Sequence, residues 1–118
     1  MTLREQWEDQ ASAWLAWARA PGHDSFWRHH GEQFNRLLPP PGALTLDIGC
    51  GEGRLSRQLT AGGHRVVGLD ASPSLIAAAR QADPSIAAGI ASTSCSDMKA
   101  MTRSAHASAA SAWRSSIR

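Results

Sequence analysis

Residues 45–53 read Thr-Leu-Asp-Ile-Gly-Cys-Gly-Glu-Gly, and this stretch decides the fold. The residues leading to the first glycine alternate between apolar and polar, which predicts a strand over residues 43–48. Glycine then occupies every second position from Gly49 to Gly53, where it permits a tight turn and a close approach of the backbone to a ligand. Residues 54–61 carry leucines four positions apart, so we expect a helix after the turn.

A second strand and a second helix follow in the same order. Residues 65–69 (Arg-Val-Val-Gly-Leu) predict a strand that ends at Asp70, and Ser72 is a suitable N-cap for a helix that ends at Pro84. This alternation predicts an α/β fold with a parallel sheet and right-handed crossovers. Asp70 lies 19 residues after Gly51, where its carboxylate can accept hydrogen bonds from both hydroxyls of a ribose. The sequence therefore predicts a nucleoside ligand at the carboxyl ends of the strands.

The spacing of the glycines separates two classes of nucleoside-binding protein. A dinucleotide fingerprint that begins at Gly49 requires glycine at position 54, but Arg54 stands there. The stretch TLDIGCGEG instead resembles the first motif of class I S-adenosylmethionine-dependent methyltransferases, and VVGLDAS resembles their second motif. The segments PGHDSFW and LLPPPG resemble the N-terminal helical region of small-molecule methyltransferases of the ubiquinone and menaquinone group. Together the resemblance covers residues 7–84, the N-terminal portion of such an enzyme.

The resemblance implies a Rossmann-like, doubly wound parallel sheet, of which residues 43–84 form the first half. It also implies that the backbone from Gly49 to Gly51 contacts the methionine part of the cofactor and that Asp47 helps to position it. Asp70 would bind the ribose hydroxyls. The expected cofactor-binding residues are Asp47, Gly49, Cys50, Gly51, Gly53, Asp70, Ala71 and Ser72. Of these, Ala71 and Ser72 would lie beside the adenine.

Residues 1–38 predict a helical cap in front of this unit. Thr2 and Glu5 form a capping box, and apolar residues then recur at spacings of three and four as far as a Pro-Gly pair. A second helix, capped by Asp24 or Ser25, is expected to stop at three consecutive prolines. Large aromatic side chains on such helices belong to a core more often than to an acceptor platform. We therefore expect a core role for Trp7, Trp14, Trp17 and Trp27, although a helical cap over a pocket could use the same side chains as core and as pocket wall.

The composition changes near Pro84. Residues 1–84 carry 8 basic and 9 acidic side chains, whereas residues 85–118 carry 4 basic and 1 acidic, together with 9 Ala and 9 Ser. This Ala/Ser-rich segment shows no strand alternation and few large apolar residues. We expect an irregular, low-complexity tail over residues 85–118 that is disordered or arises from a frame-shift. A third strand is not expected there.

The overall composition excludes several classes of protein. The chain has 118 residues, a formal net charge of +2 and two cysteines, Cys50 and Cys95. This length suits one small domain, and the weak charge does not favour a nucleic-acid partner. Two cysteines build no disulfide scaffold and no stretch reaches a membrane span of roughly 20 apolar residues, so we expect a cytoplasmic location and no membrane partner. His29 and His30 lack a second ligand pair, so no metal is expected.

The function expected through the resemblance is S-adenosylmethionine-dependent methyl transfer to a small-molecule acceptor. This short chain is expected to be an incomplete or inactive, truncated form. No catalytic residue is assigned, because transfer from a sulfonium depends mainly on holding donor and acceptor in line. Two alternatives stay open: a fragment of a nicotinamide-dependent oxidoreductase, and a non-catalytic remnant or interaction fragment. The acceptor and the oligomeric state are also open.

Overall fold

The computed structural model describes residues 1–22, 25–94 and 96–104. Helices and strands alternate after an N-terminal helical pair, as the sequence predicts. In chain order the elements are α1 (Leu3–Arg19), α2 (Ser25–Leu37), β1 (Thr45–Ile48), α3 (Arg54–Ala61), β2 (Val66–Asp70), α4 (Pro73–Ala82), a 3-10 turn (Ala87–Gly89) and β3 (Ile90–Ser92). A further helix covers residues 96–104.

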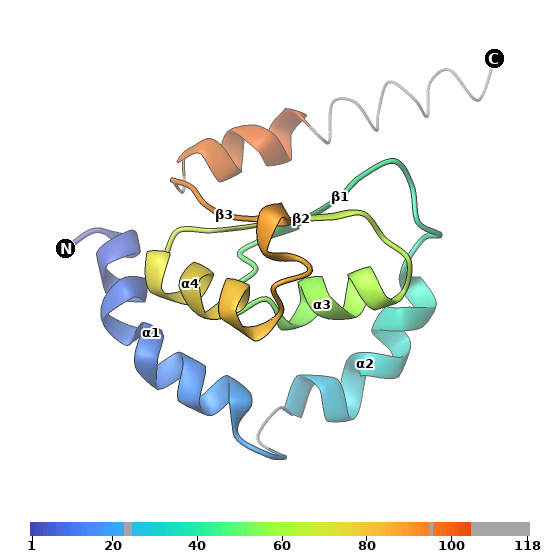
Figure 1. The fold of residues 1–118 in the computed structure, drawn as a ribbon, viewed down its shortest axis with the longest axis horizontal. Coiled ribbons are helices and arrows are strands. Elements are labelled where there is room, and N and C mark those ends of the chain that lie inside the picture. The colour runs from blue at the N-terminus through green and yellow to red at the C-terminus, as the bar shows by residue number, and fades with distance from the viewer. Residues whose placement is uncertain (23–24, 95, 105–118) are drawn as a thin grey trace.

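The strands form one parallel sheet in the order β1-β2-β3. Helix α3 connects β1 to β2 and helix α4 connects β2 to β3, so each crossover carries a helix. Figure 1 shows α3 and α4 on one side of the sheet and the helix of residues 96–104 on the other, while α1 packs against α4. The α/β class is therefore confirmed, with helices on both faces of a parallel sheet as in a doubly wound fold.

The helix ends follow the predicted capping residues. The Glu5 N–H donates to Thr2 Oγ1 at 3.2 Å and the Thr2 N–H donates to Glu5 Oε2 at 2.5 Å, which is the predicted capping box. Ser72 Oγ accepts from the Leu75 N–H at 3.2 Å at the start of α4. Asp24, one of the two residues expected to cap α2, lies outside the described residues.

Strand β3 corrects the expectation that no third strand follows Pro84. It pairs in parallel with β2, with Gly68 opposite Ile90, and the Arg80 guanidinium donates two hydrogen bonds to the Ile90 carbonyl at 3.0 and 2.7 Å. A strand of three residues is too short for alternation to reveal it, and its stability comes from partners distant in sequence. The expected irregular tail is therefore wrong for residues 90–92 and 96–104, while residues 105–118 lie outside the described part.

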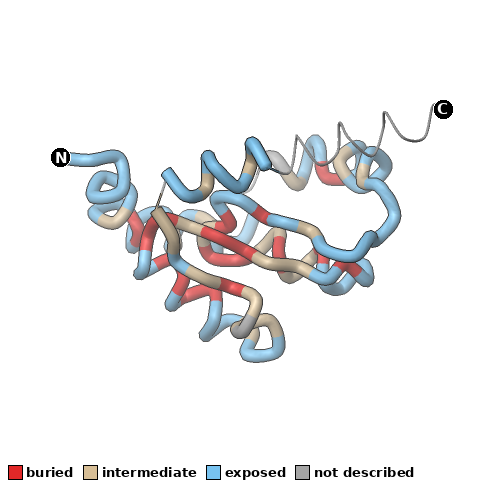
Figure 2. The backbone as a smooth tube through the Cα atoms, turned by 90° about the horizontal axis from the view of Figure 1, so that it is seen from above, coloured by how far each residue is buried: buried red, intermediate tan, exposed pale blue. Residues whose placement is uncertain are grey.

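The buried core is small and lies between the sheet and α4. Its central cluster consists of Cys50, Ile76, Ala79 and Ile90. The prediction that the α1 tryptophans belong to the core is wrong, because Trp7, Trp14 and Trp17 are 36–44% exposed. Only Ala11 of α1 is buried, and Figure 2 shows burial concentrated in the sheet and in α4. Among the described residues, no helix is both long enough and apolar enough to cross a bilayer.

Candidate nucleoside-binding site

The glycine turn after β1 has a backbone that favours glycine at alternate positions. Gly49, Gly51 and Gly53 have φ values of +78°, +54° and +83°, in the left-handed region that side chains disfavour. The N–H groups of Gly49 and Cys50 both donate to the Leu69 carbonyl, at 2.7 and 3.0 Å, which fixes the turn to β2. A Cβ on Gly49 would meet nothing within 4 Å, so the turn borders open space.

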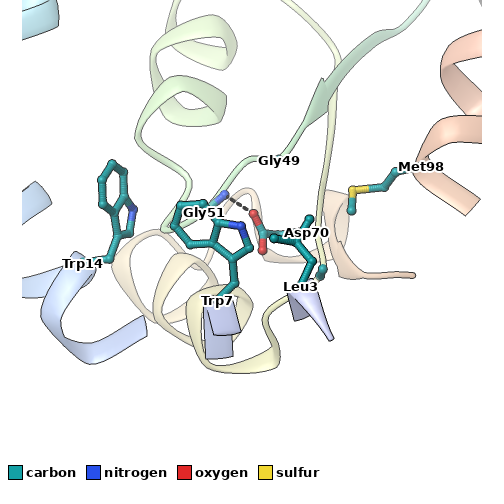
Figure 3. A pocket seen from close by; sticks show the side chains of 8 residues that line it. Leu3, Trp7, Trp14, Gly49, Gly51, Asp70 and Met98 are labelled. Atoms are coloured by element: carbon teal, nitrogen blue, oxygen red, sulfur yellow. Dashed lines mark hydrogen bonds between the residues drawn. The ribbon is translucent and has the colours of Figure 1, made fainter. Parts of the chain in front are cut away.

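Asp70 lies opposite this turn, at the end of β2. Its Oδ2 accepts a hydrogen bond from the Gly51 N–H at 2.9 Å, and its Oδ1 accepts one from the Ser72 N–H, also at 2.9 Å. These two bonds orient the carboxylate at the carboxyl edge of the sheet, as Figure 3 shows for the bond to Gly51. The sequence prediction that the glycine turn and Asp70 lie together is thus met in the geometry.

A cavity of about 260 Å³ opens between the turn, Asp70 and helix α1. Figure 3 shows side chains from α1 on one side of Asp70 and Met98 on another. The cavity is bordered by a mixture of backbone, carboxylate and apolar side chains: Leu3, Trp7, Trp14, Gly49, Gly51, Asp70, Ala71 and Met98. A second cavity, of about 220 Å³, adjoins it across Gly49 and Gly51 and reaches Asp47, Arg54 and Trp27. The two cavities flank the glycine turn.

Asp47 lies beneath the turn, where it borders the second cavity and not the first. It is 8% exposed, and its Oδ2 accepts a 2.6 Å hydrogen bond from Ser56 Oγ, which is fully buried in the first turn of α3. Burial raises the pKa of the Asp47 carboxyl above its ordinary value, and the charge of Asp70 adds to the effect, while the Ser56 hydrogen bonds oppose it. Asp47 therefore joins the end of β1 to the start of α3.

The other predicted site residues occupy different environments. Ala71 borders the first cavity, and Cys50 and Gly51 border the second. The Cys50 thiol is 8% exposed in the core, and burial raises its pKa to about 12, so it is no nucleophile at neutral pH. Gly53 caps α3, and Ser72 is fully buried with its hydroxyl engaged at the start of α4.

Sequence reasoning missed Leu3, Met98 and Glu52, and it favoured a core role for Trp7 and Trp14 over a role in the wall of a pocket. The apolar stripe along α1 indicates that Leu3, Trp7 and Trp14 share one face of the helix. It does not indicate whether that face packs against the core or lines a cavity. Met98 gave no local signal, because its position depends on the helix of residues 96–104.

Glu52, inside the glycine turn, is 4% exposed and forms ion pairs with Arg57 at 2.9 Å and Arg19 at 3.4 Å. Its partner Arg19 comes from α1, 33 positions away, so the ion pair is invisible in the sequence. The pair connects the C-terminal end of α1 to the glycine turn.

Side chains that could bind a metal ion do not cluster in the described part of the chain. Within residues 1–22, 25–94 and 96–104, no group of three or more His, Cys, Asp or Glu side chains is arranged to hold a metal ion. The neighbouring residues His29 and His30 lie on α2 and line neither of the two cavities.

Comparison with known proteins identifies the family. Residues 45–114, more than half of the chain, match the model of a family described as a methyltransferase domain. The chain belongs to this methyltransferase domain family. The match begins at β1 and continues past Pro84, through β3.

Individual relatives of this methyltransferase domain differ in their acceptors. A ubiquinone biosynthesis O-methyltransferase of Methylobacterium sp. (strain 4-46) is 44% identical over 57 residues, which cover 48% of this chain and 23% of the relative. A tRNA U34 carboxymethyltransferase of Cellvibrio japonicus is 35% identical over 86 residues, covering 64% of this chain and 26% of the relative. The chain thus spans about a quarter of the length of these relatives.

A solved structure supports the fold assignment. The crystal structure of an S-adenosylmethionine-dependent methyltransferase from Anabaena variabilis superposes with a TM-score of 0.51 and 25% sequence identity. The superposition covers 79% of this chain and 39% of that protein. The three parallel strands and their helices therefore form part of a Rossmann-like methyltransferase fold.

Proposed function

We propose that this domain binds S-adenosylmethionine and serves methyl transfer to a small-molecule acceptor. The observation that supports the proposal most directly is the position of Asp70 beside the glycine turn at the edge of the first cavity, held by the Gly51 and Ser72 N–H groups. A carboxylate fixed in this way can accept hydrogen bonds from the two ribose hydroxyls. The match of residues 45–114, which include the glycine turn and Asp70, to a methyltransferase domain supports the choice of nucleoside.

The residues around the turn fit this cofactor. Open space borders Gly49, so a ligand can approach the backbone there without meeting a side chain. Trp14 lies near Gly51, with its Nε1 atom 3.7 Å from the point that a Cβ on Gly51 would occupy. The cofactor supplies a methyl group that is already activated for displacement.

The chain's own residues would bind the cofactor, orient it and exclude water from it. Asp70 would hold the ribose, Ala71 and Leu3 would border the adenine side, and the turn from Gly49 to Gly51 would hold the methionine side. Ser72 and Asp47 would support the site by holding the starts of α4 and α3 in place, because their side-chain oxygens accept hydrogen bonds from Leu75 and Ser56. Orientation of donor and acceptor is the main catalytic contribution that such a site supplies.

The acceptor would enter from the second cavity, which adjoins the methionine side of the turn. This cavity is small and has apolar walls from Trp14, Trp27 and Leu55, together with Arg54. These dimensions favour a small molecule, and the ubiquinone-pathway relative supports the same class. A tRNA relative also exists, so a comparison of tRNA with small acceptors tests this part of the proposal.

A calorimetric titration of the 118-residue chain with S-adenosylhomocysteine, the demethylated product, tests the cofactor assignment. We expect binding by the natural chain and at least a tenfold weaker Kd for Asp70→Asn, because a carboxylate accepts stronger hydrogen bonds than an amide. Asp9→Asn is the matched control, since Asp9 is exposed on α1 and its carboxylate bonds to neighbouring Gln10. Equal affinities for the natural chain and Asp70→Asn would refute the assignment, as would preferential binding of a nicotinamide dinucleotide.

A further inference from the structure

Glu8 of α1 reaches across to the first residues of α4. Its Oε2 accepts a 2.5 Å hydrogen bond from Ser72 Oγ and a 3.3 Å bond from the Ser74 N–H, and its Oε1 accepts from the Ser74 hydroxyl. These partners are 64 and 66 positions away in sequence. A carboxylate at this place also faces the positive end of a helix dipole. These hydrogen bonds hold the pKa of the Glu8 carboxyl below its ordinary value.

This contact continues into the nucleoside site without a break. Ser72 donates its hydroxyl to Glu8 and its N–H to Asp70 Oδ1, and Asp70 Oδ2 accepts from the Gly51 N–H. A chain of hydrogen bonds thus joins α1, the start of α4, the ribose-facing carboxylate and the glycine turn. Glu8 is therefore the α1 residue that is linked to Asp70.

The same helix supplies one wall of the first cavity. Leu3, Trp7 and Trp14 border the cavity, and the rings of the two tryptophans meet edge to face at 6.1 Å between centroids. Figure 3 shows Leu3 and Trp7 beside Asp70. We call these three side chains the α1 wall. Because Ala11 is the only described residue of α1 that is buried, few apolar contacts hold this wall in place.

Polar contacts at two points therefore decide where the α1 wall lies. Glu8 binds the start of α4 near the N-terminal end of the helix. Arg19 binds Glu52 at 3.4 Å and the Ala78 carbonyl at 3.2 Å near the other end. The contact at Glu8 is adjacent to Trp7 in sequence, so it controls the part of the wall that lies beside Asp70.

We propose that Glu8 is a positioning residue for the bound nucleoside: it holds the α1 wall against the cavity and orients Asp70 through Ser72. This inference rests on the proposed cofactor binding. Glu8 itself lines no part of the first cavity, so its proposed role is indirect. Its effect is to slow ligand escape, because the wall must move aside before the nucleoside leaves.

The test compares Glu8→Ala and Glu8→Gln with the control Asp9→Asn, which changes charge at the neighbouring exposed position. Ser74→Ala is a second variant that removes one hydroxyl donor without changing charge. Tryptophan fluorescence in stopped flow would give association and dissociation rates of S-adenosylhomocysteine. Amide hydrogen exchange of the ligand-free chain would report opening of residues 3–19 separately from residues 54–61.

We expect Glu8→Ala to raise the dissociation rate about tenfold, with the association rate changed less than about threefold. Glu8→Gln and Ser74→Ala should give intermediate increases, and Asp9→Asn should give none. Exchange should accelerate in α1 and stay unchanged in α3, which a general loss of stability would not produce. Unchanged exchange in α1 of Glu8→Ala, or natural dissociation rates in that variant, would overturn the proposal.

Failure of the cofactor assignment would look different. In that case the natural chain binds no S-adenosylhomocysteine, while the exchange experiment still decides whether Glu8 holds α1 in place. Accelerated exchange with normal ligand dissociation would limit Glu8 to a structural role and would also overturn the positioning proposal.

Discussion

Replacing Gly68 by alanine tests the packing that the sequence did not reveal. Gly68 lies in the middle of β2, opposite Ile90 of β3. A Cβ at this position would lie 2.6 Å from Ile90 Cδ1, 2.9 Å from Ser56 Oγ and 3.1 Å from Cys50 Sγ. All three distances are shorter than ordinary van der Waals contact, so the added methyl group forces its neighbours to move.

The neighbours have little freedom to move. Ile90 is 1% exposed, and Ser56 is fully buried with its hydroxyl bound to Asp47. Inserting a methyl group into such a site costs about 1–3 kcal/mol, and three simultaneous close contacts place Gly68→Ala near about 3 kcal/mol. Gly42→Ala is the matched control, because a Cβ there meets nothing within 4 Å, and its expected effect is below about 0.5 kcal/mol.

Urea unfolding followed by circular dichroism measures both free energies of unfolding. A second substitution sharpens the test, because Ile90→Val removes the Cδ1 atom that lies nearest to the new methyl group. In the Gly68→Ala background it should restore about 1 kcal/mol, whereas alone it should destabilise by about 1 kcal/mol. Natural stability of Gly68→Ala, or a further loss in the double variant, would refute the packing of β3 against β2.

Three other predictions concern titration, reactivity and the coding sequence. Burial raises the pKa of Asp47 in the folded chain above the ordinary value of 3.8, so at pH values between 3.8 and the raised pKa the folded state binds more protons than the unfolded state, and the contribution of Asp47 to the free energy of unfolding falls as pH rises. Relative to the natural chain, Asp47→Asn should therefore gain stability as pH rises in unfolding experiments, and a difference that does not change with pH would contradict this assignment. With its pKa near 12, the Cys50 thiol should react with iodoacetamide at pH 8 far more slowly in the folded chain than in urea, and equal rates would show that it is accessible. Translation of the coding DNA beyond codon 84 in the other two forward frames tests the frame-shift prediction for the tail, which predicts an uninterrupted methyltransferase-like continuation in one of them; the lack of such a continuation would count against it.

Local chemistry explains why the glycine turn and Asp70 were predictable. Three glycines at alternate positions need left-handed φ values, and the acid that ends the next strand is brought to the same edge by any parallel βαβ unit. The capping residues Thr2 and Ser72 were predictable for the same reason, since each acts within three residues of its own position.

Contacts between distant residues explain what the sequence did not reveal. Strand β3 depends on the space above Gly68 and on Arg80, and neither is visible in the three residues of the strand. The tryptophans of α1 follow a helical stripe, but periodicity indicates only which side chains share a face. Whether a sheet, solvent or a ligand covers that face depends on contacts such as the hydrogen bonds that Glu8 accepts from Ser72 and Ser74 at the start of α4.

The measurement that tests the central claim most directly is a ¹H–¹⁵N NMR titration of the chain with S-adenosylhomocysteine. The claim is that the nucleoside binds in the first cavity, against the glycine turn and Asp70 and next to the α1 wall. It predicts that the largest shifts occur at the amides of Gly49, Gly51 and Ala71 and at the Trp7 and Trp14 indoles, with residues 54–61 less affected. Shifts confined to other regions, or no shifts at millimolar ligand, would contradict the claim.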